Sequence, residues 1–171
     1  ERAVSPEARR QVAVLGRFDG SGRRLWLRQL SQDDASGRNP VVRVAGGIIH
    51  VAWIEQRADA QPRVMVATLD AAGGWLQPPR DVAAAGRDTW NLNAAVDHAG
   101  ALHVLFDAAT ATRSKELRWV RVGDGAIDDR RAGRDDGFES AYPDIALDGT
   151  RYAVTWFDSR DGNSEVYLRC G

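Results

Sequence analysis

A sequence repeat with a period near fifty residues constrains this fold more than any other feature. The stretch from Tyr142 to Cys170 matches Pro40 to Arg57 without a gap when it is shifted by 103 positions. A shift of 51 gives a middle copy, in which Phe157 and Asp158 fall on Phe106 and Asp107. A degenerate first copy pairs Phe18-Asp19 with Phe157-Asp158. This period, with alternating hydrophobicity inside each copy, is typical of the blades of a β-propeller.

We therefore treat residues 1–171 as one domain with four repeat units, at about residues 5–38, 39–90, 91–141 and 142–171. The predicted fold class is all-β, a partial β-propeller of about three and a half to four blades with four antiparallel strands each. No segment keeps the apolar spacing of a helix, so essentially no helix is expected. Residues 31–39 are predicted as a loop, and the fourth strand of the second unit is expected near residues 80–84.

Composition and charge exclude several partner classes. The chain has 23 basic and 24 acidic residues, and it has no Lys/Arg cluster that would mark a nucleic-acid surface. No apolar run reaches the roughly 18 residues that a membrane-spanning helix needs. We therefore expect neither a nucleic-acid partner nor a membrane span.

The single cysteine, Cys170, excludes an internal disulfide and a cysteine metal cluster. The chain begins at Glu1 instead of Met, and its last unit stops after a third strand, which we interpret as a piece of a longer array. An open array exposes strand edges and an apolar blade face. We therefore expect either further propeller blades or a second copy of the chain to close the ring.

Residues 143–146, 156–163 and 165–169 carry a recognisable pattern. They resemble the sialidase-like propeller repeats of the bacterial neuraminidase type. An Asp-box-like turn, which resembles Ser-x-Asp-x-Gly-x-Thr-Trp with its glycine one place late, is formed by Thr68, Asp70, Gly73 and Trp75. The resemblance implies a propeller of six to eight blades and an extracellular or periplasmic location.

The catalytic residues of that family cannot be carried over to this chain. Its early Arg-Ile-Pro motif is absent, and the only tyrosines available for a nucleophile pair are Tyr142, Tyr152 and Tyr167. The first hypothesis is a scaffold of a secreted or surface protein that binds a glycan or a protein through loops at one end of the ring. The alternative is a fragment of a sialidase-type glycoside hydrolase whose catalytic residues lie partly outside this chain.

Two copies of a Trp-x-acid-x-Arg motif are candidate ligand-binding residues. They are Trp53, Glu55 and Arg57 in one copy and Trp156, Asp158 and Arg160 in the other. A tryptophan beside an arginine and a carboxylate suits sugar recognition by stacking and planar hydrogen bonding. Recurrence in separate units instead favours a structural role, with the tryptophan packed between blades and the carboxylate paired with the arginine.

The loop after Trp156 is also a candidate Ca²⁺ site. Its oxygen donors are Asp158, Asp161, Asn163 and Glu165 around Gly162. The competing interpretation is a turn in which Asp and Asn cap backbone groups and glycine supplies a positive φ. No other cofactor is expected. We interpret the three histidines, which lack metal-ligand spacing, as packed or hydrogen-bonded side chains.

Overall fold

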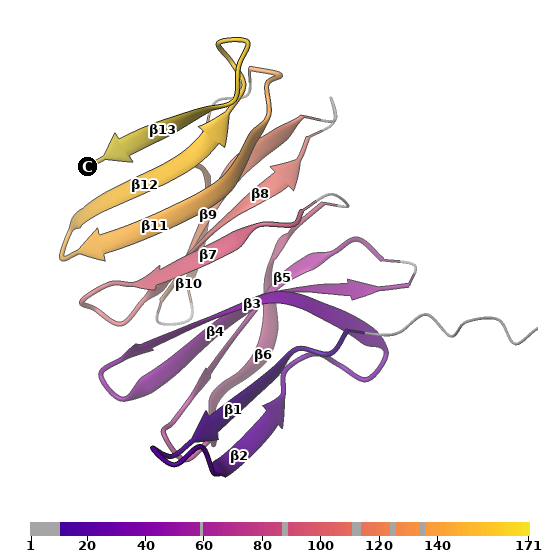
Figure 1. The fold of residues 1–171 in the computed structure, drawn as a ribbon, viewed down its shortest axis with the longest axis vertical. Helices are drawn as coiled ribbons and strands as arrows, with labels where there is room; N and C mark the ends of the chain where they lie inside the picture. Colours follow the sequence, from indigo (N-terminus) through magenta and orange to yellow (C-terminus); the bar gives the residue numbers. More distant parts are fainter. Residues whose placement is uncertain (1–10, 59, 87–88, 111–113, 124–125, 134–135) are drawn as a thin grey trace, which may run out of the picture.

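The computed structural model describes residues 11–58, 60–86, 89–110, 114–123, 126–133 and 136–171, which form thirteen β-strands (Figure 1). The strands are β1 (Val14–Phe18), β2 (Arg24–Gln29), β3 (Ala35–Ala45), β4 (Ile48–Arg57), β5 (Arg63–Leu69), β6 (Trp75–Ala84), β7 (Leu92–Val96), β8 (Leu102–Ala109), β9 (Lys115–Gly123), β10 (Ala126–Arg131), β11 (Ser140–Asp148), β12 (Arg151–Asp158) and β13 (Glu165–Cys170).

The strands form four antiparallel sheets, in which each strand pairs with its neighbour in the chain. The first sheet is β1–β2, the second β3–β6, the third β7–β10 and the fourth β11–β13. The leading strand β7 contacts β3 on one side and β11 on the other, so the sheets follow one another as an open array (Figure 1). The described residues contain strands and no helix, which confirms the predicted all-β architecture. No helix in the described part of the chain is long and apolar enough to cross a membrane.

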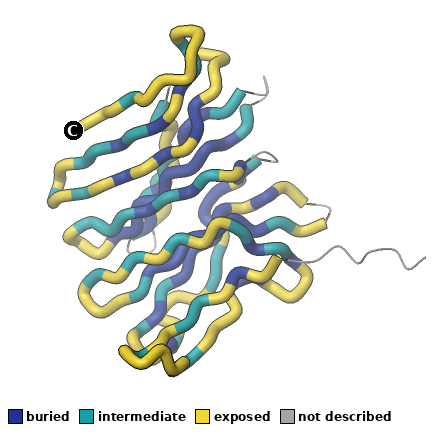
Figure 2. The backbone as a smooth tube through the Cα atoms, viewed as in Figure 1, coloured by how far each residue is buried: buried dark blue, intermediate teal, exposed yellow. Residues whose placement is uncertain are grey.

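Three apolar clusters hold the sheets together. The largest, which includes Ile54 and Phe106, lies between the second and third sheets. A second packs Trp53 against the first sheet, and a third packs Leu105 against Trp156 between the third and fourth sheets. The buried segments accordingly run through the middle of the array (Figure 2). Each sheet buries its faces only against its neighbours, as in other repeat architectures.

A β-bulge recurs in the leading strands β3 and β11. The β3–β4 register shifts between Arg38 and Val41, and the β11–β12 register shifts between Ala141 and Asp144. The bulges hold Asn39-Pro40 and Tyr142-Pro143, and proline is tolerated there because it need not donate to the ladder. The predicted loop over residues 31–39 is therefore only partly correct, because β3 already begins at Ala35.

The β7–β8 turn is one residue longer than the other leading turns. Residues 98–100 separate the pair Asp97 and Ala101, whereas two residues separate Asp148 from Arg151 in the β11–β12 turn. Because side chains alternate along a strand, one extra residue moves the following side chains to the opposite face. Phe106 therefore packs against the second sheet, while its partner in the ungapped match, Phe157, is exposed.

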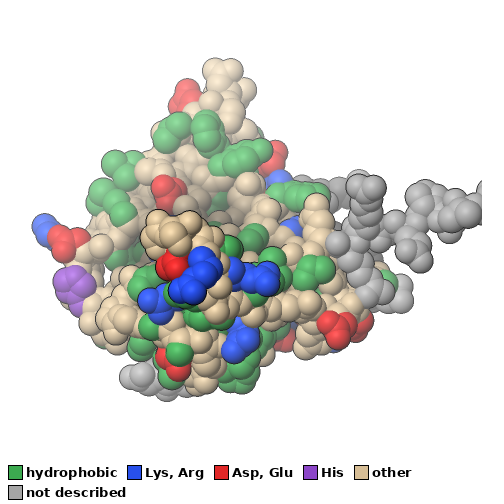
Figure 3. Space-filling view, turned by 60° about the horizontal axis from the view of Figure 1, so that its bottom comes forward, with side chains coloured by type: hydrophobic (Ala, Val, Ile, Leu, Met, Phe, Trp, Pro, Cys, Tyr) green, Lys and Arg blue, Asp and Glu red, His purple; other side chains and the backbone are tan. Residues whose placement is uncertain are grey.

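The two terminal sheets expose apolar side chains. They include Leu25 and Leu27 on the first sheet and Val166 and Leu168 on the fourth. Figure 3 brings the end with the first sheet forward, and it shows hydrophobic and basic side chains side by side. Open sheets of this kind fit a partial propeller, whose terminal faces lack a neighbouring blade.

Candidate functional site

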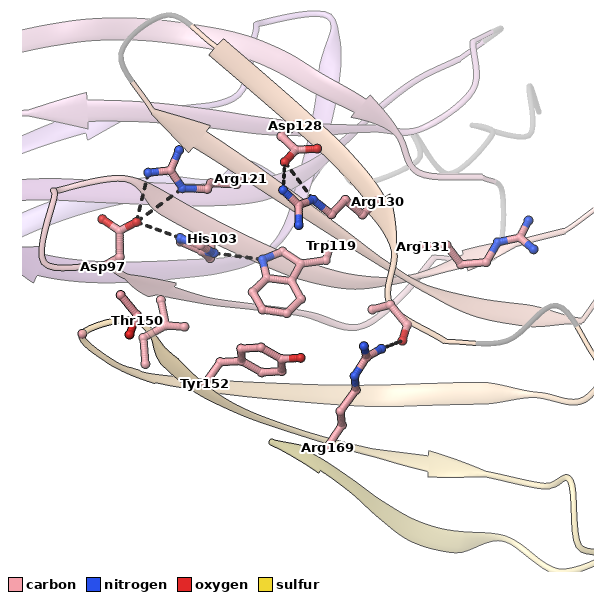
Figure 4. A pocket seen from close by; sticks show the side chains of 13 residues that line it. Asp97, His103, Trp119, Arg121, Asp128, Arg130, Arg131, Thr150, Tyr152 and Arg169 are labelled. Carbon is pink, nitrogen blue, oxygen red and sulfur yellow. Dashed lines mark hydrogen bonds and ion pairs between the residues drawn. The ribbon is translucent and has the colours of Figure 1, made fainter. Parts of the chain in front are cut away.

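A pocket of about 400 Å³ lies between the third and fourth sheets (Figure 4). Strands β8, β9 and β10 form one wall, and residues from the fourth sheet form the other. Its polar and aromatic lining consists of Asp97, His103, Trp119, Arg121, Asp128, Arg130, Arg131, Thr150, Tyr152 and Arg169.

A chain of hydrogen bonds orders the floor of this pocket (Figure 4). Trp119 donates from Nε1 to Nδ1 of His103 at 3.0 Å, and Nε2 of His103 lies 3.0 Å from Oδ2 of Asp97. Because Nδ1 accepts from an indole N–H, the proton of the neutral imidazole lies on Nε2 and points at the carboxylate. Asp97 is itself fixed by the β7–β8 turn, where the backbone N–H of Ala101 donates to its Oδ1 at 2.9 Å.

The pKa of Asp97 falls to about 2. Burial alone would raise this pKa, but hydrogen bonds from His103, the Ala101 backbone and Arg121 favour the charged form more strongly. Asp97 is therefore ionised at neutral pH. It positions His103 and Arg121, and it is not a proton donor under those conditions.

Three of the four arginines in the pocket have a carboxylate partner. Arg121 lies 3.2 Å from Asp97, and Nε of Arg131 lies 2.9 Å from buried Glu116. Arg130 pairs with Asp128. The hydrogen bond from Arg130 lowers the pKa of Asp128, and the same bond raises the pKa of Arg130.

Arg169 on β13 differs from these three arginines. Its Nη1 lies 3.4 Å from the backbone carbonyl of Ala132, and no described carboxylate lies within ion-pair distance of it. Arg169 is exposed, and it projects from the fourth sheet toward the pocket (Figure 4). The pocket therefore carries one positive charge that the described residues do not compensate.

Two aromatic rings complete the pocket. Trp119 and Tyr152 meet edge to face, with ring centroids 5.0 Å apart and planes at 80°. The backbone of Tyr152 is fixed by two hydrogen bonds with Gly171, of 2.8 and 3.1 Å. Flat apolar surfaces beside fixed cations suit a ligand that combines an apolar ring face with an anionic group.

The first predicted binding motif lies in the second sheet, away from this pocket. Trp53 is fully buried, and its Nε1 is 3.4 Å from Oε2 of Glu55, which also accepts from the backbone N–H of Gln32 at 3.2 Å. Arg57 lies 3.8 Å from the same carboxylate. These contacts tie the end of β4 to the segment before β3.

The second predicted motif makes a similar arrangement at the end of β12. Oδ2 of Asp158 accepts from Trp156 at 3.0 Å and from the Ser140 hydroxyl at 2.8 Å. Arg160 donates from Nε to Oδ1 of Asp158 at 2.9 Å, and this bond is the main reason that the pKa of Asp158 lies well below its usual range. Both carboxylates are occupied within the chain, so a ligand role for the two motifs stays a prediction.

The candidate Ca²⁺ donors lie in the β12–β13 loop. Besides the bonds of Asp158, Asp161 accepts a hydrogen bond from the Tyr167 hydroxyl, which raises the pKa of Tyr167 to about 12. Asn163 and Glu165 are exposed. The described residues hold no group of three or more His, Cys, Asp or Glu side chains placed to bind a metal. Calcium binding therefore stays a prediction.

The Asp-box-like residues form the β5–β6 turn. Oδ1 of Asp70 accepts from the backbone N–H groups of Ala72 and Gly74, both at 2.8 Å, and Gly73 has a φ of 84°. Thr68 lies on β5 and half-exposed Trp75 begins β6. The geometry shows a carboxylate-capped turn.

The pocket itself was not predicted from the sequence. The sequence predicts a packed or hydrogen-bonded side chain for His103. Its ring makes hydrogen bonds to Trp119 and Asp97, but the sequence does not predict these partners. The arginines are spread over β9, β10 and β13, so they form no basic cluster along the chain.

Comparison with known proteins establishes the fold. No family model matches the sequence, and no curated protein matches it. The solved structure of Hadza microbial sialidase Hz136 is similar, with a TM-score of 0.64 and 14% identity over 91% of this chain. A B. megaterium levansucrase variant matches with a TM-score of 0.52 and 10% identity, also over 91% of this chain.

This chain covers 37% of the sialidase and 46% of the levansucrase, which is less than half of either protein. At these identities the likeness concerns the fold alone. The fold is that of a sialidase-like β-propeller, present here as four sheets that do not close into a ring.

Proposed function

We propose that this chain is a propeller scaffold that binds an acidic glycan in the pocket between the third and fourth sheets. The main support for this proposal comes from Arg169. It has no carboxylate partner among the described residues, and it lies beside the aromatic pair Trp119 and Tyr152. A sugar ring packs on the aromatic surface, and its carboxylate or sulfate pairs with Arg169. The charges of the other three arginines are compensated by Asp97, Asp128 and Glu116, so Arg169 supplies the net positive charge of the lining.

The electrostatics of the pocket support binding more than hydrolysis at this place. A glycosidase needs one carboxylic acid that stays protonated to donate to the leaving group. In this pocket the pKa values of Asp97 and Asp128 are both lowered. The likeness to a sialidase structure supports hydrolysis as the second candidate. The sequence resemblance to sialidase-like repeats supports a secreted or surface location.

Isothermal titration of the chain with methyl glucuronide, N-acetylneuraminic acid and neutral methyl glucoside tests the proposal. We expect the acidic sugars to bind at least about ten-fold more tightly, because a charge-assisted bond adds on the order of 1.5–3 kcal/mol. Arg169→Gln should remove this difference. Arg24→Gln, at an exposed position on β2, is the matched control and should leave it unchanged.

Equal binding of acidic and neutral sugars, unchanged by Arg169→Gln, would overturn the proposal. The same preparations are assayed with a fluorogenic sialoside. Release of the fluorophore by the chain would favour the hydrolase instead.

A further inference from the structure

His50 and His103 occupy equivalent positions in neighbouring sheets. In the second sheet, Arg43 pairs with His50 as the third pair from the β3–β4 turn. In the third sheet, Ala95 pairs with His103 as the third pair from the β7–β8 turn, after Asp97 with Ala101 and Val96 with Leu102. Each histidine lines a pocket against the sheet that follows it.

The partners that satisfy His103 have no counterpart around His50. The position of Trp119, which pairs with Leu105, corresponds to Val66, which pairs with Ala52. The position of Asp97 at the turn corresponds to Ala45. An indole N–H and a carboxylate are thus replaced by two aliphatic side chains.

His50 is consequently buried without a hydrogen-bond partner. His50 is only 4% exposed, and neither of its ring nitrogens has a hydrogen-bond partner in the described part of the chain. Burial lowers the pKa of His50, so the ring is neutral at pH 7 and offers one donor and one acceptor. Leaving both groups unpaired is costly, and such a group in a folded protein requires an explanation.

His50 lines a pocket of about 410 Å³ between the second and third sheets. Most of the wall is aliphatic, and includes Ile48, Val66, Leu76 and Leu102. Thr68 and Gln77 are the uncharged polar side chains in it. Arg121 is its charged lining residue, and that charge is already paired with Asp97. The volume falls within the range of small-molecule sites.

We infer that this pocket is a second binding site, for a neutral hydroxylated ligand such as an uncharged pyranoside. One ligand hydroxyl donates to the unprotonated nitrogen of His50, and a second ligand oxygen accepts from its N–H. The apolar face of the ring packs on the aliphatic wall. A charged ligand is disfavoured, because no uncompensated opposite charge among the described lining residues would offset the free-energy cost of desolvating it.

NMR spectra of the imidazole Cε1–Hε1 groups report on this site directly, because the chain has three histidines that can be assigned by substitution. The chain is titrated with methyl β-galactopyranoside, methyl glucuronide and toluene. We expect the His50 signal to shift saturably with the neutral glycoside. We expect little change with the glucuronide.

Two substitutions separate hydrogen bonding from simple packing. His50→Phe keeps an aromatic ring without its nitrogens and should weaken binding of the neutral glycoside by about ten-fold. Thr68→Val removes a polar lining group at constant size, and it tests the inference if His50→Phe does not fold. Its expected effect is a smaller, few-fold loss, measured on the His50 signal. Arg24→Gln is the control on a distant strand.

A His50 signal that stays unchanged up to the solubility limit of the glycoside would overturn the inference. Saturable shifts with toluene alone would also overturn it, because they would show an apolar cavity in which His50 plays no recognition role.

Discussion

Asn39 and Tyr142 hold the same place in two β-bulges that lie 103 residues apart, and both have a left-handed backbone, with φ of 50° and 54°. Asparagine tolerates this conformation, whereas a bulky aromatic residue rarely adopts it. The bulge geometry is therefore a property of the repeat, imposed even where the side chain disfavours it.

The first prediction concerns this bulge. Asn39→Ala should lower the free energy of unfolding by about 1 kcal/mol, because alanine is strained at a positive φ. Asn39→Gly should be close to neutral, because glycine adopts this φ without strain. Urea denaturation of both variants checks the difference. Equal stability of the two variants would show that φ does not limit this position.

Substitutions at two glycines in turns allow the free-energy cost of backbone strain to be measured separately from the cost of steric contact. Gly22 and Gly73 follow a capping aspartate by three residues and have φ of 82° and 84°. A Cβ on Gly22 would meet nothing within 4 Å, but on Gly73 it would lie 2.8 Å from the Trp26 ring. Gly22→Ala should cost about 1–2 kcal/mol, and Gly73→Ala should cost more because Trp26 must also move.

Thermal and urea unfolding of the two variants measure this contrast. If the free energy of unfolding falls no more for Gly73→Ala than for Gly22→Ala, the Trp26 ring moves aside at no free-energy cost.

The Asp158 carboxylate should contribute to stability above its ordinary pKa. Its bonds from Arg160, Trp156 and Ser140 hold the folded-state pKa well below the ordinary 3.8, so the contribution is complete above that value and declines as the pH falls below it. Asp158→Asn should cost about 2–4 kcal/mol at pH 7, because it removes the charge that pairs with Arg160.

Asp148→Asn is the matched control, because the Asp148 side chain is largely exposed and its pair with Arg151 contributes little. Denaturation at pH 7 and pH 3 should show the cost of Asp158→Asn shrinking at the lower pH. A cost that is independent of pH would contradict the assignment.

The pocket carboxylate Asp97 gives a separate pH prediction. Its folded-state pKa of about 2 lies below the ordinary 3.8, so its contribution is present above pH 4 and is lost as the pH falls toward 2. The contribution is on the order of 2 kcal/mol. Asp97→Asn should remove this pH dependence and shift the imidazole signals of His103, as NMR at pH 7 would show.

If Asp97→Asn leaves the His103 signals unchanged, the hydrogen bond between these residues does not set the orientation of the imidazole. Arg24→Gln, on the distant strand β2, is the control and should leave the His103 signals unchanged.

The sequence predicted the fold better than the sites, for a physical reason. The period near fifty and the alternating hydrophobicity can be read from the order of the residues, and they indicate sheets of antiparallel strands without knowledge of which side chains meet in space. The ungapped match failed in the third sheet, because the extra residue in the β7–β8 turn changes which face Phe106 occupies.

The structure also places the degenerate first copy of the repeat differently from the sequence match. Asp19, which the sequence match equates with Asp158, instead caps the β1–β2 turn, accepting from the backbone of Ser21 and Arg23. This geometry matches that of Asp70 in the β5–β6 turn. A short degenerate copy contains too few matching residues to show which turn of the repeat it corresponds to.

The candidate pocket could not be predicted, because it depends on how neighbouring sheets pack. His103 and Tyr152 meet the same cavity from strands in different sheets, and the pairing state of Arg169 depends on carboxylates elsewhere. The difference between the partnered His103 and the unpartnered His50 likewise appears only when equivalent strand positions are compared in space.

The strand order within the sheets also has a consequence for how the chain folds. Every ladder joins strands that are consecutive in the chain, so each pairing closes only a short loop and loses little chain entropy. Low sequence separation between contacts favours rapid folding. We therefore expect hairpins to form locally, and we expect the docking of one sheet on the next through the apolar clusters to be the slower, cooperative step.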